Sequence, residues 1–135
     1  MPKFGFKALI LDDSLINIAL LELILNTFGL SCRTAETIQD ASELLADQQF
    51  DVSFIDFHMP GQNGGEFIKV AEANGKLAHL RHILIVTADV MFQPKACGLD
   101  HLISGFILKP IDPAEIEAHL RRELYGKRSC QPVSG

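Results

Sequence analysis

An excess of positive charge is missing from this sequence. Its 135 residues include 12 Lys and Arg against 17 Asp and Glu, which gives a formal net charge of −5. Proteins that bind duplex DNA draw much of their affinity from cationic contacts to phosphates. We therefore expect no direct nucleic-acid partner.

Long apolar runs are missing as well. No run approaches the about 20 residues of a membrane-spanning helix, and the first five residues lack the apolar stretch of a signal peptide. The three cysteines lie far apart without Cys-x-x-Cys spacing, so neither a disulfide framework nor a zinc site is indicated. We expect no membrane insertion and a cytoplasmic location.

The residues that are present suit one globular domain. The hydrophobic fraction is 47% and the charged fraction 21%, both close to globular averages. Short runs rich in branched aliphatic residues recur along the chain, at residues 8–11, 52–55, 83–86 and 106–108, with a weaker candidate at 31–35. Runs of this length and composition are typical of strands buried on both faces of a parallel sheet.

Segments with helical periodicity separate these strands. The first predicts a helix whose inward stripe is Ile16, Ala19, Leu20, Leu23, Ile24 and Phe28. Others begin near residues 38 and 65, and a short, weakly patterned one covers 93–99. The last has a clear start, with Asp112 as N-cap, Pro113 at N1 and Glu115 at N3. Five β-α units predict an α/β fold, a doubly wound five-stranded parallel sheet with helices on both faces.

Polar residues follow four of the predicted strands, where ligand sites of such sheets lie. They are Asp12 and Asp13, Asp56, Thr87, and Lys109. Taken singly, each could be an ordinary turn or cap residue. Packed together, three carboxylates repel one another and attract a hard divalent cation. The set therefore predicts a site for Mg²⁺, or Mn²⁺, and for phosphoryl transfer onto an aspartate.

The sequence resembles the response-regulator receiver domains of two-component phosphorelays over about residues 6–124. The stretches that carry the resemblance are Leu9-Ile10-Leu11-Asp12-Asp13, Asp56-Phe57-His58-Met59-Pro60 with Asn63-Gly64, Thr87-Ala88, and Phe106-Ile107-Leu108-Lys109-Pro110. The resemblance implies a sheet of strand order 2-1-3-4-5, a receiver domain at residues 1–124 and a C-terminal tail at 125–135.

The resemblance also implies a role for each matching residue. Asp56 would be the phosphoacceptor and would bind the metal with Asp13, with Asp12 acting mostly through water and His58 through its backbone carbonyl. Thr87 and Lys109 would bind the phosphoryl oxygens. Phe106 occupies the position of the aromatic switch residue, although a strand aromatic also suits the core. Met59-Pro60 and Asn63-Gly64 would shape the loop after Asp56, and Gly64 would supply a positive φ.

Three further expectations concern regulation and partners. His58 and Asp89, two residues beyond Asp56 and Thr87, would tune the lifetime of the phosphoryl group. Ile18, Leu21 and Leu25 lie off the inward stripe of the first helix and would dock a helical phosphodonor, unless the helix has a broad buried face. The partners would be a sensor histidine kinase or histidine phosphotransfer protein and a downstream protein target, with dimerisation left open.

The resemblance implies a signalling domain that assists its own phosphorylation and dephosphorylation rather than a turnover enzyme. The length leaves no room for a DNA-binding output domain, so output would pass through protein contacts. Alternatives are an aspartate-nucleophile phosphohydrolase, a flavin-binding module of the same topology, and a docking scaffold that needs no phosphorylation. The presence of Asn17 after Asp13 favours the interpretation that this chain is the receiver of a hybrid kinase. The stretch 98–106 is longer and more apolar than is usual for the family.

Overall fold

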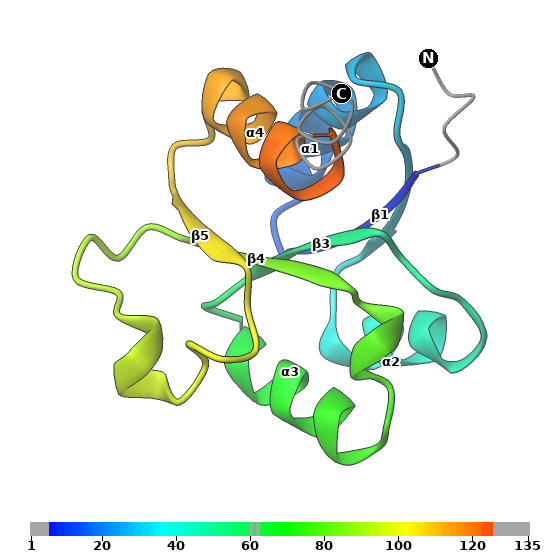
Figure 1. The fold of residues 1–135 in the computed structure, drawn as a ribbon, viewed down its shortest axis with the longest axis vertical. Helices are drawn as coiled ribbons and strands as arrows, with labels where there is room; N and C mark the ends of the chain where they lie inside the picture. Colours follow the sequence, from blue (N-terminus) through cyan, green and yellow to red (C-terminus); the bar gives the residue numbers. More distant parts are fainter. Residues whose placement is uncertain (1–5, 60, 62, 126–135) are drawn as a thin grey trace, which may run out of the picture.

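A single parallel sheet forms the centre of the molecule (Figure 1). The structure is a computed structural model and describes residues 6–59, 61 and 63–125. The strands are β1 (Lys7–Leu11), β2 (Ser31–Ala35), β3 (Val52–Asp56), β4 (His82–Thr87) and β5 (Gly105–Leu108). They pair in parallel in the order β2-β1-β3-β4-β5. This confirms the predicted fold class and strand order.

Helices cover both faces of the sheet and close two separate cores. One face carries α1 (Leu15–Thr27) and α4 (Pro113–Leu120), with a π-helical turn η4 (Arg121–Tyr125) after α4; the other carries α2 (Ile38–Asp47) and α3 (Gly64–Ala73) (Figure 1). The side chains of each strand alternate between the two cores, as Ile10 and Leu11 do in β1. The predicted start of the last helix is confirmed, since the Asp112 side chain accepts the N–H of Ala114.

The connection between β4 and β5 differs from the sequence-based expectation. In place of a helix over 93–99 there is a 3₁₀ turn, η3 (Pro94–Cys97), and residues 88–104 contain no α-helix. Pro94 opens the turn, and Gly98, in the left-handed region at φ 73°, ends it. The segment is anchored by two buried side chains, Phe92 and Leu99.

The orientation of α1 also differs from the prediction. Ile16 and Leu23, expected in the core, are 81% and 66% exposed, whereas Ile18, Leu21 and Leu25 are buried. The prediction that Ile18, Leu21 and Leu25 reach the surface and dock a phosphodonor is therefore wrong. These residues pack against the sheet in the core shared with α4. Because α1 is apolar on nearly every side, its periodicity does not determine which stripe faces inward.

The predicted C-terminal tail, residues 125–135, begins at Tyr125, which is the last residue of η4. Residues 126–135 of that tail lie outside the described residues. Among the described helices, none is long and apolar enough to cross a membrane.

Candidate functional site

Three carboxylates converge where β1 and β3 end. One oxygen from each of Asp12, Asp13 and Asp56 lies within 4.8 Å of the others. Asp12 and Asp56 are buried, at 1% and 3% exposure, whereas Asp13 is exposed. The parallel pairing of β1 with β3 brings these strand ends side by side, as the sequence predicts.

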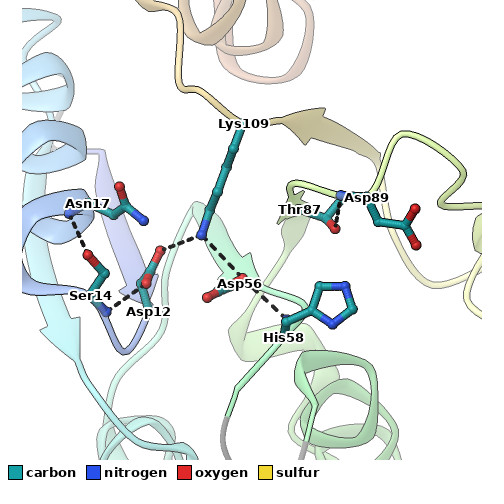
Figure 2. Close-up of polar contacts among 8 residues, drawn as sticks. All are labelled: Asp12, Ser14, Asn17, Asp56, His58, Thr87, Asp89 and Lys109. Carbon is teal, nitrogen blue, oxygen red and sulfur yellow. Dashed lines mark hydrogen bonds and ion pairs between the residues drawn. The ribbon is translucent and has the colours of Figure 1, made fainter.

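The Lys109 ammonium reaches between the two buried carboxylates (Figure 2). Its Nζ lies 3.5 Å from Asp56 Oδ1 and 3.6 Å from Asp12 Oδ2. Lys109 directly follows β5, and its backbone N–H donates to the carbonyl of Thr87 at 2.8 Å. That bond fixes the base of the lysine at the edge of the sheet, so that its long side chain crosses the end of β3.

Burial dominates the electrostatics of Asp56. Desolvation raises the pKa of its carboxyl from 3.8 to about 6, and the nearby Asp12 carboxylate adds to the rise. The Lys109 ammonium and the backbone N–H of His58, which donates to Asp56 Oδ1 at 3.3 Å, act in the opposite direction. The negative charge of Asp56 is therefore only partly compensated by the protein itself.

The hydrogen bonds of the Asp12 carboxylate indicate whether a cation fits at this site. Its Oδ1 accepts the backbone N–H of Ser14 at 2.8 Å, whereas its buried Oδ2 has no hydrogen-bond partner among the described residues. The Lys109 ion pair at 3.6 Å is too long to serve as that hydrogen bond. A buried carboxylate oxygen without a hydrogen bond, next to two other carboxylates, suits a hard divalent cation.

Thr87 is fully buried at the end of β4, and its hydroxyl is held by the following loop. The hydroxyl oxygen accepts the N–H of Asp89 at 3.1 Å, and the Asp89 carboxylate in turn accepts the N–H of Met91 at 2.9 Å. Figure 2 shows the hydroxyl directed toward Asp89 rather than toward Asp56. Thr87 can therefore reach a group on Asp56 only if its side chain rotates.

The loop after β3 returns close to Asp56, and Gly64 makes this possible. The Gly64 N–H donates to the carbonyl of Phe57 at 2.9 Å. A Cβ on Gly64 would collide with the Asp56 carbonyl oxygen and would lie 2.7 Å from Ile55 Cγ2. The expectation of a positive φ at Gly64 is wrong, because this residue is the first of α3 and the constraint is space. Asn63 caps α3 in a reciprocal capping box with Glu66.

The other predicted residues differ in their exposure and in whether they contact the carboxylates. His58 is exposed and its N–H contacts Asp56, while Phe106 is half-buried beside Phe92. Met59 packs against the core under α2 and α3, and Pro60 lies outside the described residues. Ile18, Leu21 and Leu25 are not part of the site. They are buried in the core that α1 and α4 form with the sheet.

Two contributors were not identified from the sequence. Ser14 binds Asp12 through its N–H and caps α1 by accepting the N–H of Asn17 at 3.3 Å (Figure 2). Its place between the acidic pair and the first apolar run is a helix-start signal that could have revealed it. Phe92, whose ring lies between Phe57 and Phe106, has no such local signal.

Comparisons with known proteins identify the family of this chain. The model of the response regulator receiver domain family matches residues 8–121. Stress response regulator protein 1 of Debaryomyces hansenii is 33% identical over 103 residues, which cover 71% of this chain and 42% of that protein. Hybrid signal transduction histidine kinase L of Dictyostelium discoideum is 30% identical over 128 residues, 90% of this chain and 7% of the kinase. The chain thus spans less than half the length of either relative.

Solved structures share the fold. The chemotaxis protein CheY4 of Vibrio cholerae superposes with a TM-score of 0.78 at 27% identity, over 88% of this chain and 98% of its own. A Thermotoga maritima response regulator in complex with Mg²⁺ and BeF has a TM-score of 0.76 at 22% identity, over 88% and 99% of the two chains. With the family model covering most of the sequence, the chain belongs to the response regulator receiver domain family and is a receiver domain of two-component phosphorelay signalling.

Proposed function

We propose that Asp56 accepts a phosphoryl group from a phosphohistidine of a histidine kinase or histidine phosphotransfer protein. The observation that carries the proposal is the placement of three carboxylates within 4.8 Å of one another, with the Lys109 ammonium 3.5 Å from Asp56. An Asp56 oxygen attacks phosphorus, the phosphorus–nitrogen bond breaks, and its electron pair returns to the imidazole ring of the partner. The product on this chain is an aspartyl phosphate.

Asp12, Asp13 and Asp56 would hold a divalent cation, Mg²⁺ or Mn²⁺, with the backbone carbonyl of His58 as a further ligand. When bound, the cation neutralises negative charge on the transferring phosphoryl group. Lys109 binds a phosphoryl oxygen from the opposite side. Thr87 rotates away from Asp89 to donate its hydroxyl to another oxygen, and Phe106 responds as the switch residue.

His58 and Asp89 tune the lifetime of the aspartyl phosphate. His58 is exposed next to the acceptor, and Asp89 holds the Thr87 hydroxyl through its N–H. We expect both residues to influence how water reaches the phosphoryl group, His58 from its place beside Asp56 and Asp89 through its bond to Thr87. Replacing either residue by Ala should change the dephosphorylation rate without abolishing phosphorylation. A time course of adduct loss by intact mass checks this, and unchanged rates in both variants would refute it.

The exposed face of α1 is the docking surface for the phosphodonor. This α1 face, defined as Leu15, Ile16, Leu20 and Leu23, is 37–81% exposed. It is continuous with the site, because Ser14 both caps α1 and binds the Asp12 carboxylate. A partner whose phosphohistidine projects from an amphipathic helix could lay the apolar side of that helix on this face while the imidazole reaches Asp56.

The receiver domain comprises residues 1–124. It acts as a phosphoacceptor rather than as a turnover enzyme, and its location is the cytoplasm. Its acidic groups are arranged to accept and retain one phosphoryl group. The phosphorylated domain signals by binding a downstream protein target, and dimerisation is an alternative means of signalling. A scaffold that needs no phosphorylation is the competing function, and the experiment below separates the two.

The test is incubation of the purified chain with a small acyl phosphate and Mg²⁺, followed by intact-mass measurement. We expect one phosphoryl adduct on the unmutated chain and none on Asp56→Asn. Asp100→Asn, which changes an exposed aspartate away from the site, should retain the adduct and serves as the matched control. The absence of any adduct on the unmutated chain would contradict the proposal and favour the scaffold.

A further inference from the structure

Three aromatic rings connect the acceptor strand to β5. Phe57 directly follows Asp56, and its ring centroid lies 5.0 Å from that of Phe92. Phe92 in turn lies 5.2 Å from Phe106, and both contacts are edge-on, with interplanar angles of 60° and 70°. Such contacts depend on ring orientation, so the position of one ring constrains the next. We call Phe57, Phe92 and Phe106 the aromatic triad.

Phe92 is held firmly, although it comes from a loop. Its side chain is 7% exposed, and its N–H donates to the carbonyl of Asp89 at 3.0 Å. Further along, the Lys69 ammonium donates to the carbonyl of Cys97 at 2.9 Å, and Leu99 is fully buried. Residues 88–104 contain no α-helix, so contacts of this kind, together with the local turn hydrogen bonds, hold the connection between β4 and β5.

The triad is also connected to the carboxylate of Asp56. The His58 N–H donates to Asp56 Oδ1, and the His58 ring stands edge-on to the Phe57 ring at 5.1 Å and 89°. An aspartyl phosphate removes the negative charge from the carboxyl group itself. A hydrogen bond to a charged acceptor is stronger than one to a neutral acceptor, so the His58 N–H bond weakens on phosphorylation. The peptide between Phe57 and His58 is then held mainly by the bond from the Gly64 N–H to the Phe57 carbonyl, about which it can turn.

We propose that Phe92 is a positioning residue that couples the acceptor strand to Phe106 by a route that does not pass through Thr87. This inference rests on the proposed function of Asp56. A shift of Phe57 moves the edge on which the Phe92 ring rests, and Phe92 transfers the change to Phe106 in β5. The Thr87 hydroxyl acts in parallel, through the N–H of Asp89 at the start of the same loop.

The experiment uses Mg²⁺ with beryllium fluoride as a stable phosphoryl mimic. Amide chemical shifts are recorded by NMR: the His58 amide reports on binding at Asp56, and the amides of 105–108 report on the response of β5. In Thr87→Ala at saturation, we expect about a third or more of the β5 response to remain. In the double variant with Phe92→Leu, which keeps an apolar side chain but removes the ring edges, it should fall below about a tenth.

Leu99→Ala is the matched control. It removes buried volume from the same loop but keeps every ring of the aromatic triad, so combined with Thr87→Ala it should leave the residual β5 response in place. The inference is overturned if Thr87→Ala alone abolishes the β5 response, or if adding Phe92→Leu leaves the response unchanged. If the His58 amide of the unmutated chain does not respond to the mimic, the proposed function itself fails and the inference fails with it.

Discussion

Burial of the Asp56 carboxyl in the folded chain costs stability at neutral pH. Its folded pKa of about 6 lies above the usual pKa of an unfolded aspartate, because burial and Asp12 disfavour the charged form. Between about pH 4 and 6 the folded state binds more protons than the unfolded state. The contribution of Asp56 to stability is therefore fully present below pH 4 and is lost as the pH rises through 6.

Asp56→Asn should consequently stabilise the metal-free chain at pH 7. We expect an increase of about 1–3 kcal/mol in the free energy of unfolding, since each pKa unit corresponds to about 1.4 kcal/mol. Urea denaturation in the presence of a chelator measures it. The gain should shrink toward pH 4, and Asp100→Asn, at an exposed aspartate, should show neither effect. A destabilised Asp56→Asn protein at pH 7 would refute the prediction.

Gly64 is a second position where one residue determines the site. Gly64→Ala places a Cβ against the backbone of Asp56 and the side chain of Ile55, so the end of β3 or the start of α3 has to move. We expect a loss of about 1–3 kcal/mol, typical of overpacking, and slower phosphorylation by a small acyl phosphate. Denaturation and intact-mass time courses measure the two effects.

Gly65→Ala is the control for Gly64→Ala. A Cβ on Gly65 would meet only side-chain atoms: Leu99 Cδ1 and Phe57 Cε1 at 3.1 Å and the capping oxygen Asn63 Oδ1 at 3.2 Å. Its effect should be clearly smaller, since no backbone atom of Asp56 is displaced. Equal losses in the two variants would show that the close approach at Gly64 has no special role.

At the scale of elements, α1 carries apolar residues on both its buried and its exposed sides. Ile16→Ser and Leu23→Ser change the exposed α1 face and should slow phosphoryl transfer from a helical phosphodonor by about fivefold or more. Transfer from a small acyl phosphate should stay unchanged, because that donor does not need the helix. Phosphotransfer time courses with both donors measure the difference.

Val70→Ser provides the matched control for the α1 face. Val70 is 45% exposed on α3, on the other side of the sheet, so the same kind of substitution there should leave both transfer rates unchanged. Equal slowing with both donors in the α1 variants would locate the defect in the site rather than in docking. Leu21 and Leu25 are unsuitable for this test, because polar substitution of a buried residue would destabilise the fold.

The connection from β4 to β5 shows a limit of local pattern. The weak periodicity of 93–99 includes Pro94 and is followed by Gly98, and the chain forms only the 3₁₀ turn η3. The connection from β4 to β5 also buries Phe92 and Leu99, which no period predicted. Contacts distant in sequence, to Phe57 and Phe106, hold this loop in place of a regular helix.

At the scale of the whole molecule, the sheet gathers residues separated by nearly 100 positions into one cluster of charged side chains, from Asp12 to Lys109. Because the unfolded chain does not bring these residues together, Mg²⁺ should bind only the folded state and raise the free energy of unfolding by mass action. The gain is about 2.7 kcal/mol at a concentration 100 times the dissociation constant. Urea denaturation across a Mg²⁺ series measures it. Asp13→Asn, an exposed position whose change should spare the fold, should weaken the dependence, and a Mg²⁺-independent stability would contradict the cation site.

The sequence by itself determined the alternation of strands and helices, the parallel sheet, and the meeting of Asp12, Asp13, Asp56 and Lys109 at one edge of that sheet. It could do so because parallel strands end at one edge, so residues that follow them converge whatever the details of packing. Only the tertiary structure decided which side of α1 faces outward, why Gly64 is needed, and where Phe92 lies. Each of these depends on contacts between distant segments, and a helix that is apolar on both sides carries no local signal of its orientation.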